Sequence, residues 1–223
     1  MEIKPIAQIY TDFPEKFGIP RQSGLAKSLR GRIVFEPEYR NPDALRGLDG
    51  FSHIWLIWEF SEAKRENWSA TVRPPRLGGN TKMGVFATRS PFRPNPIGLS
   101  CVKLDRIEYT ENEGPVLHVS GADLMDNTPI FDIKPYVPFA DSVEDATAGF
   151  AGEKYDHALI VNIPDGLLER VPSDLRVPLL KVLAQDPIPA YKKDADRVYG
   201  FEFADLEVKF KTDGENLEVV DIL

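Results

Sequence analysis

Several residue types that would place this protein in another class are scarce in its 223 residues. It has one cysteine, Cys101, which excludes an internal disulfide bond. Because Cys101 lies in an apolar run, we expect a buried and unreactive thiol. The three histidines have no second ligand at metal-binding spacing, so no metal site is expected. We expect His53, His118 and His157 to be structural or surface residues, although His53 could donate a hydrogen bond within a pocket.

Long hydrophobic runs are also missing. No stretch approaches the roughly 18 consecutive apolar residues of a membrane helix, so no membrane association is expected. The first ten residues have no apolar core followed by a cleavage site, so we expect a cytoplasmic protein. The segment Gly98-Leu99-Ser100-Cys101-Val102 does not complete Gly-x-Ser-x-Gly, and a serine hydrolase is therefore discarded.

Acidic residues outnumber basic ones, and the net charge is -8. The distribution is uneven, because residues 64–106 contain nine cations and two acids, whereas residues 107–223 contain ten cations and 24 acids. A basic segment in an acidic protein is typical of a phosphate-facing surface. A solvated, arginine-rich loop would give the same count, so charge alone does not decide between the two.

The first two thirds of the chain alternate short apolar runs with Gly and Pro, as antiparallel β structure does. We predict a mainly β protein whose N-terminal part is an antiparallel β-barrel. Residues 41–47 are predicted to form a short helix, with Asn41 as its cap and Pro42 at its first position, closing one end of the barrel. The predicted strands are residues 3–10, 31–35, 51–60, 83–88, 97–109, 115–122 and 128–137.

A small α+β C-terminal domain is predicted beyond an acidic stretch of mostly small residues, 142–149, which has no strand-like alternation. We therefore divide the chain into residues 1–145 and 146–223. Asp213-Gly214 is predicted to be the turn between the last two strands. Pro178 requires the helix to begin near it or to kink there. The predicted elements are strands 157–163, 198–203, 206–211 and 217–222 and a helix over 179–185.

Residues 71–98 are dense in Pro, Gly and Arg. Proline restricts the backbone, glycine allows a ligand to approach closely, and arginine presents planar donors that suit carboxylate or phosphate. The segment is consistent with a preorganised, anion-facing loop. It is equally consistent with a Pro-rich connection whose arginines stay solvated.

The same segment resembles a known family. Residues 72–80 (VRPPRLGGN), 84–90 (GVFATRS) and 92–98 (FRPNPIG) closely resemble the TsaA-like, or TrmO (YaeB), family. Three further blocks agree in the same order: 20–22 (PRQ), 132–139 (DIKPYVPF) and 183–191 (LAQDPIPAY). The resemblance implies a barrel that binds S-adenosylmethionine without a Rossmann domain, and a homodimer. The absence of a strand followed by Gly-x-Gly-x-x-Gly and a helix agrees with this.

The resemblance further implies methylation of N6 of N6-threonylcarbamoyladenosine at position 37 of threonine tRNAs. It also implies a set of cofactor-binding residues. One departure is that Ser61-Glu62 stands where relatives have His-Gln, and the negative charge of Glu62 changes the local field. The implied cofactor-binding residues are Pro20, Arg21, Gln22, Ser61, Glu62, Arg89, Leu99, Asp123, Leu124, Met125, Asp126 and Thr128.

The reaction requires two substrates held about 3 to 3.5 Å apart and a base that removes the proton from a weakly nucleophilic nitrogen. Asp126, Asp132, Lys134 and Tyr136 lie in matched blocks and are candidates for the base or for gripping the threonyl carboxylate. A capping aspartate or a surface lysine would fit the same positions.

An anticodon loop can present a splayed base to such a site. The candidate phosphate-binding residues are Lys64, Arg65, Arg73, Arg76 and Arg93. Trp55 and Trp58 are expected in the core rather than as base-stacking residues. Asp186, Pro189 and Tyr191 are candidates to border the partner subunit's active site, which would make dimerisation necessary for activity. The competing hypothesis is a noncatalytic RNA-binding or ligand-sensing barrel.

Overall fold

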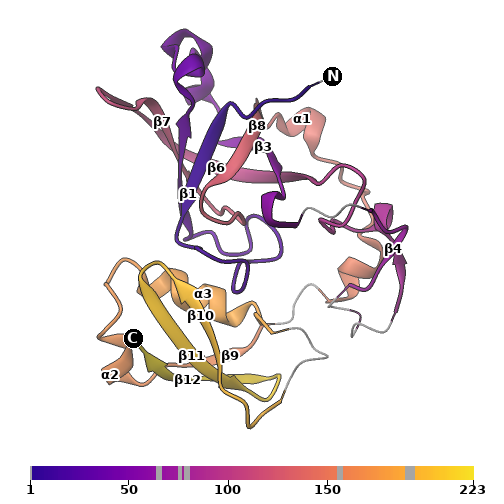
Figure 1. Ribbon diagram of the computed structural model, residues 1–223, viewed down its shortest axis with the longest axis vertical. Helices are drawn as coiled ribbons and strands as arrows, with labels where there is room; N and C mark the ends of the chain where they lie inside the picture. Colours follow the sequence, from indigo (N-terminus) through magenta and orange to yellow (C-terminus); the bar gives the residue numbers. More distant parts are fainter. Residues whose placement is uncertain (1, 64–66, 75–76, 78–80, 155–157, 189–193) are drawn as a thin grey trace.

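The computed structural model describes the whole chain except residues 1, 64–66, 75–76, 78–80, 155–157 and 189–193. Its N-terminal part is a closed antiparallel barrel with strand order β1-β2-β7-β6-β3-β8 (Figure 1). This confirms the predicted mainly β fold. The strands are β1 (Ala7–Thr11), β2 (Arg30–Phe35), β3 (His53–Glu59), β6 (Ile97–Thr110), β7 (Gly114–Ser120) and β8 (Thr128–Pro135).

Alternation along each strand fills the barrel interior. In β3, Ile54, Leu56 and Trp58 are buried, and the residues between them face outward. Trp58 therefore belongs to the core, as predicted. Trp55 does not: it is partly exposed on the outer face, where its indole N–H donates to Asp141 Oδ2 at 3.1 Å. The apolar run conceals this two-residue period because outward positions are also apolar.

Two predicted elements of this region are wrong in detail. Residues 83–88 are not a barrel strand: β5 (Met83–Gly84) pairs with β4 (Thr71–Val72) in a separate two-stranded sheet, and a 3-10 turn follows at Val85–Ala87. The short helix near Asn41 is a 3-10 turn, Pro42–Leu45, in which the Asn41 side chain accepts from the Asp43 N–H at 3.0 Å. The capping residue was thus predicted correctly and the helix type was not.

The C-terminal part is a four-stranded sheet in the order β10-β11-β12-β9. Helix α3 tolerates Pro178 near its start, because the N–H groups of a helix's first turn have no intrahelical acceptor. Gly214 occupies the predicted turn with φ of 101°. The elements are α1 (Pro138–Asp141), β9 (Ile160–Asn162), α2 (Asp165–Leu168), α3 (Arg176–Ala184), β10 (Tyr199–Phe203), β11 (Leu206–Thr212) and β12 (Asn216–Ile222).

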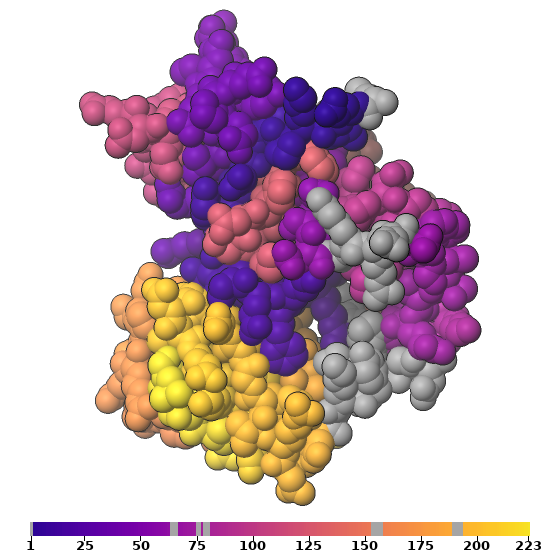
Figure 2. Space-filling model, in the orientation of Figure 1, coloured from indigo at the N-terminus to yellow at the C-terminus, as the bar shows by residue number. Residues whose placement is uncertain are grey.

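The segment between β1 and β2, residues 12–29, joins the two parts. Its Phe13, Ala26 and Leu29 are buried in the same hydrophobic cluster as α3 and strands β10 to β12. Figure 2 shows indigo N-terminal residues lying directly against the yellow C-terminal part. The core of the C-terminal sheet is therefore completed by residues from the N-terminal region.

Candidate cofactor site

The predicted cofactor residues gather at an open edge of β6. Residues 97–102 of β6 pair with β3 on one side, but pairing with β7 on the other side begins only at Lys103. Ser23, in the 12–29 segment, partly replaces the missing strand, because its Oγ accepts from the Cys101 N–H at 3.2 Å. The segment that contains Pro20, Arg21 and Gln22 is thereby fixed against the barrel.

Asp123 is brought to the same edge by the turn that follows β7. Gly121, with φ of 82°, makes this turn and accepts a hydrogen bond from the Gly24 N–H at 2.9 Å. Ser100 Oγ donates to Asp123 Oδ1 at 2.6 Å. The Trp58 indole N–H donates in turn to Ser100 Oγ at 3.0 Å. A chain of hydrogen bonds thus runs from the barrel interior to the carboxylate.

Charge around Asp123 is balanced by Arg89. Burial raises the pKa of the Asp123 carboxyl, and the hydrogen bond from Ser100 and the positive charge of Arg89 oppose that rise. Arg89 also donates to the Gln22 side-chain carbonyl. The structure therefore brings together Gln22, Arg89 and Asp123, three cofactor candidates from separate segments.

The other candidates of the 12–29 segment and of residues 61–62 lie nearby. Arg21 donates to the Asp186 carbonyl at 3.3 Å, and Pro20 is buried. Lys16 Nζ donates to the Glu62 carbonyl at 2.5 Å and lies 4.0 Å from the Glu62 carboxylate. Glu62 is exposed, so its charge is screened by water and partly offset by Lys16.

Most side chains of the turn at residues 123–128 pack in the core or form hydrogen bonds within the protein. Leu124 is in the barrel core, and the buried Thr128 donates to the Met125 carbonyl at 2.7 Å. The Asp126 carboxylate accepts from the Thr11 N–H at 2.9 Å and from the Asn127 side chain at 2.7 Å. These contacts fit the capping interpretation of Asp126 better than that of a base.

Asp132, Lys134 and Tyr136 occupy the outer face beside this cluster. Ile57 pairs with Leu99 on one side and Asp132 on the other, so these residues form a row across β6, β3 and β8. Neighbouring strands lie about 4.8 Å apart, which places Asp132 roughly 10 Å from Leu99. Leu99 is 52% exposed. Lys134 Nζ pairs with Asp132 Oδ2 at 2.9 Å.

The thiol of Cys101 lies on this face and is only partly buried, contrary to the expectation of full burial. Burial nevertheless raises its pKa, which keeps the thiol protonated and unreactive. His53 contacts Ser52 at 2.9 Å and His118 contacts Glu108 at 2.7 Å, while His157 lies outside the described residues. Within the described ranges, no group of three or more His, Cys, Asp or Glu could hold a metal ion.

Of the predicted phosphate-binding residues, two can be placed. Arg73 is exposed, and it has no hydrogen-bond partner among the described residues. Arg93 instead donates to the Thr88 carbonyl at 3.2 Å, which stabilises its own loop. The other three, Lys64, Arg65 and Arg76, lie outside the described residues.

An aromatic pair that the sequence did not predict lies in this region. The rings of Trp68 and Phe86 stack with centroids 6.2 Å apart and an interplanar angle of 27°. Both side chains are exposed, at 53% and 73%. They are 18 residues apart in an irregular segment, so the sequence offered no periodicity that would join them.

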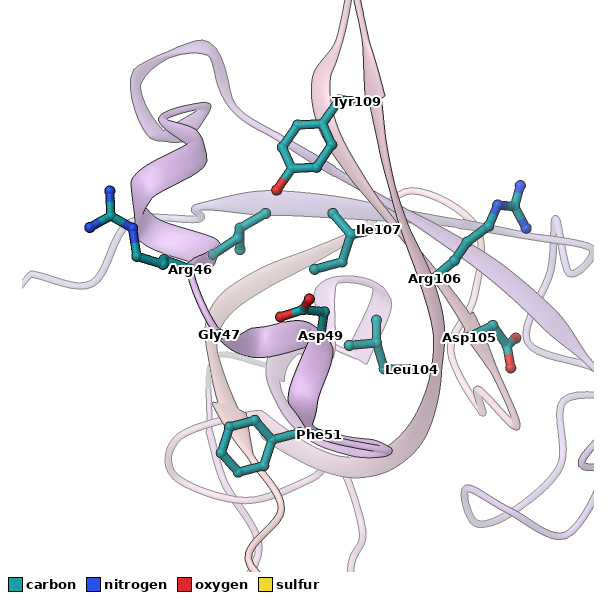
Figure 3. Close-up of a pocket in the computed structure, with 10 residues that line it drawn as sticks. Arg46, Gly47, Asp49, Phe51, Leu104, Asp105, Arg106, Ile107 and Tyr109 are labelled. Carbon is teal, nitrogen blue, oxygen red and sulfur yellow. The ribbon is translucent and has the colours of Figure 1, made fainter.

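A separate hollow of about 500 Å³ lies beside the β6–β7 hairpin (Figure 3). Asp49 and Tyr109 point into it, whereas Arg46 and Arg106 point away. Arg46 forms an ion pair with Asp43 at 2.5 Å, and Arg106 forms one with Glu108 at 3.3 Å. This hollow contains none of the predicted cofactor residues and offers no inward cation for a carboxylate, so the edge of β6 is the candidate cofactor site.

The closed antiparallel barrel, with its cluster of polar residues at the edge of β6, places the protein outside the Rossmann class. The comparisons specify the family. The tRNA-methyltransferase O N-terminal domain matches residues 8–142, and the TrmO C-terminal domain matches residues 166–223. The chain belongs to the TrmO family.

Individual relatives cover nearly the whole chain. It is 40% identical to a tRNA (adenine(37)-N6)-methyltransferase of Escherichia coli, over 98% of this chain and 96% of that protein. It is 42% identical to a putative S-adenosylmethionine-dependent methyltransferase of Pseudomonas aeruginosa, over 92% and 90% of the two chains. A crystal structure of TrmO from Pseudomonas aeruginosa superposes with a TM-score of 0.79 at 36% identity, covering 100% of this chain and 98% of the other.

Proposed function

We propose that this protein is an S-adenosylmethionine-dependent methyltransferase acting on N6 of adenine 37 in tRNA. The observation that carries the proposal is the 40% identity to a tRNA (adenine(37)-N6)-methyltransferase over almost the full length of both chains. The polar cluster of Gln22, Arg89 and Asp123 is the structural observation that supports it. We further propose that the substrate base is N6-threonylcarbamoyladenosine of threonine tRNAs.

The chemistry of the cluster fits S-adenosylmethionine. The Arg89 guanidinium suits the cofactor's carboxylate, and the acceptors of Gln22 and Asp123 suit its amino group or ribose hydroxyls. The exposed side chain of Leu99 offers an apolar surface beside them. When bound, S-adenosylmethionine supplies a methyl group that is open to attack by a nucleophile.

The protein's own task is mainly positioning. The hydrogen bonds of Ser23 and Ser100 fix the site before any ligand arrives, so little ordering is left for the moment of binding. On the outer face, Asp132 is the candidate that would accept the proton from N6, and Lys134 is the candidate that would hold the threonyl carboxylate. Their side chains contact each other at 2.9 Å, so both can reach neighbouring groups of one substrate.

A noncatalytic barrel that binds RNA or senses a ligand is the rival function. The two are separated by incubating the protein with methyl-labelled S-adenosylmethionine and tRNA that carries or lacks the threonylcarbamoyl group. Label in the first tRNA alone supports the proposed enzyme and substrate. Label in neither, with cofactor binding retained, would establish the rival. Label in both would reject the proposed dependence on the threonylcarbamoyl group.

We also propose that the enzyme is a cytoplasmic homodimer and that its chain divides near residues 145 and 146. The described part of the chain contains no helix that has both the length and the apolar character needed to cross a membrane. Asp186 borders the cofactor segment of its own subunit through Arg21, while Pro189 and Tyr191 lie outside the described residues. Light scattering tests the dimer: a monomeric mass at the concentrations where the enzyme is active would reject it.

A further inference from the structure

The exposed aromatic pair in the arginine-rich region has no role in the cofactor cluster. Trp68 and Phe86 stack on each other rather than on a hydrophobic core, and most of their surface faces water. Exposing two large rings side by side is unfavourable unless a partner covers them, so such a pair marks an interaction site.

The pair is held in place by the local backbone. Val85 is buried, and its N–H donates to the Ala70 carbonyl at 3.0 Å, which fastens the segment of Phe86 to that of Trp68. The 3-10 turn at Val85–Ala87 directs Val85 inward and Phe86 outward. Strands β4 and β5 add the pairs Thr71 with Gly84 and Val72 with Met83. The rings are therefore preorganised, so little conformational entropy of the protein would be lost when a ligand binds.

The surroundings of the pair specify the partner. It lies in the basic segment of an otherwise acidic chain, and the exposed Arg73 follows β4 directly. Aromatic rings beside cations are the combination that binds single-stranded nucleic acid, where bases stack on the rings and phosphates contact the cations. Figure 1 shows β4 beside the barrel rather than within it, and the exposure of Trp68 and Phe86 leaves both rings accessible to a ligand.

We propose that Trp68 and Phe86 form a stacking platform for an unpaired base of the tRNA anticodon loop, next to the base that is methylated. This inference rests on the proposed function. Phe86 is three residues from Arg89, which spans at most about 10 Å of chain, so a neighbouring nucleotide can reach the platform while the target base lies at the cofactor cluster. The platform takes the base faces, and Arg73 takes the phosphates.

The test measures the affinity of the protein for an anticodon-arm hairpin of a threonine tRNA and for a fully paired RNA duplex of the same length. Trp68→Ala and Phe86→Ala should each weaken hairpin binding about tenfold and leave duplex binding nearly unchanged. Trp68→Phe should retain hairpin affinity, because a phenyl ring still stacks, but should lose the quenching of tryptophan emission that RNA causes in the unchanged protein. Tyr109→Ala is the matched control, because Tyr109 is 61% exposed on β6, and the end of the β6–β7 hairpin lies on the opposite side of the barrel from β4.

Salt dependence separates stacking from charge. Trp68→Ala should keep the slope of log affinity against log salt, whereas Arg73→Ala should reduce its magnitude by about 0.7. If both aromatic variants bound the hairpin with wild-type affinity, the stacking platform would be rejected and the proposed function would stand. A change of assembly mass in those variants without a change in RNA affinity would also overturn the platform, because the pair would then be a contact between copies. Failure of the unchanged protein to bind any tRNA would overturn the proposed function as well.

Discussion

Gly18 lies so close to the ring of Phe201 that a Cβ at position 18 would come within 2.4 Å of the ring carbon Cδ2. Gly18 also has φ of 92°, a conformation that residues with side chains rarely adopt. This contact joins the segment that contains Pro20, Arg21 and Gln22 to β10 of the C-terminal sheet. The C-terminal part therefore supports the candidate cofactor site without containing the polar cluster itself.

Gly18→Ala should destabilise the protein by about 2 kcal/mol or more, because the new methyl group overpacks the contact and the backbone is strained. It should also weaken cofactor binding, since the 12–29 segment must shift. Thermal unfolding and calorimetry with S-adenosylmethionine measure the two effects. Gly24→Ala is the control: it has φ of 77° but no atom within 4 Å of the added Cβ, so it retains only the strain. Equal effects of the two changes would contradict the role of Phe201.

Arg89→Ala should weaken S-adenosylmethionine binding while the fold stays nearly intact, because Arg89 is exposed and contributes its charge to Gln22 and Asp123. Isothermal titration calorimetry measures the affinity, and circular dichroism checks the fold. Arg106→Ala is the control: it removes an exposed arginine of β6 that pairs with Glu108, and it should leave the affinity unchanged. An unaltered affinity in Arg89→Ala would remove Arg89 from the site.

Asp123→Asn should raise the melting temperature near neutral pH and lower cofactor affinity. The folded state raises the pKa of Asp123 above its usual 3.8, so the folded protein binds the proton more tightly than the unfolded chain does. The stability of the protein therefore falls as pH rises from 3.8 through the raised pKa of the folded state. The neutral amide avoids this cost and can still accept from Ser100. Melting curves recorded across pH should converge below the usual value of 3.8. A variant that is less stable than the unchanged protein at neutral pH would reject this account.

Asp213 has the opposite dependence on pH. Hydrogen bonds from the N–H groups of Asn216 and Glu215 lower the pKa of Asp213 to about 2. Its stabilising effect is therefore fully present above the usual 3.8 and is lost as pH falls through about 2. Asp213→Ala should lower the melting temperature at pH 6, and near pH 2 it should melt at almost the same temperature as the unchanged protein. An equal drop in melting temperature at both pH values would show that the turn does not depend on the carboxylate charge.

The barrel strands could be predicted because each carries a local signal. Alternation in residues 97–104 and Gly and Pro at the strand ends give positions within a few residues of those observed. The strand prediction was wrong at residues 83–88. Of the 3-10 turn at Val85–Ala87, Val85 is buried and the other two residues are exposed, and the chain does not join the barrel. A local pattern does not reveal whether a neighbouring strand is available for pairing.

The candidate site could be predicted only in part. Matched motifs named Gln22, Arg89 and Asp123, and the structure brings these three together. The supporting residues Ser23 and Ser100 carry no motif of their own, because a serine is recognisable as a donor or acceptor only once its partner is known. The same holds for Trp68 and Phe86, whose stacking depends on the pairing of β4 with β5.

The sequence by itself determined the family, the mainly β composition, the side-chain alternation along each strand and the residue types available for an anionic ligand. Tertiary structure alone decided that β6 keeps an open edge, that Ser23 and Asp123 meet there, and that Phe13 and Leu29 belong to the C-terminal core. The physical reason is that periodicity and turn residues act over a few neighbouring positions. Strand pairing and burial, by contrast, join residues far apart in the sequence, such as Ala7 and Ile130, and their free energy depends on surfaces that exist only in the folded chain.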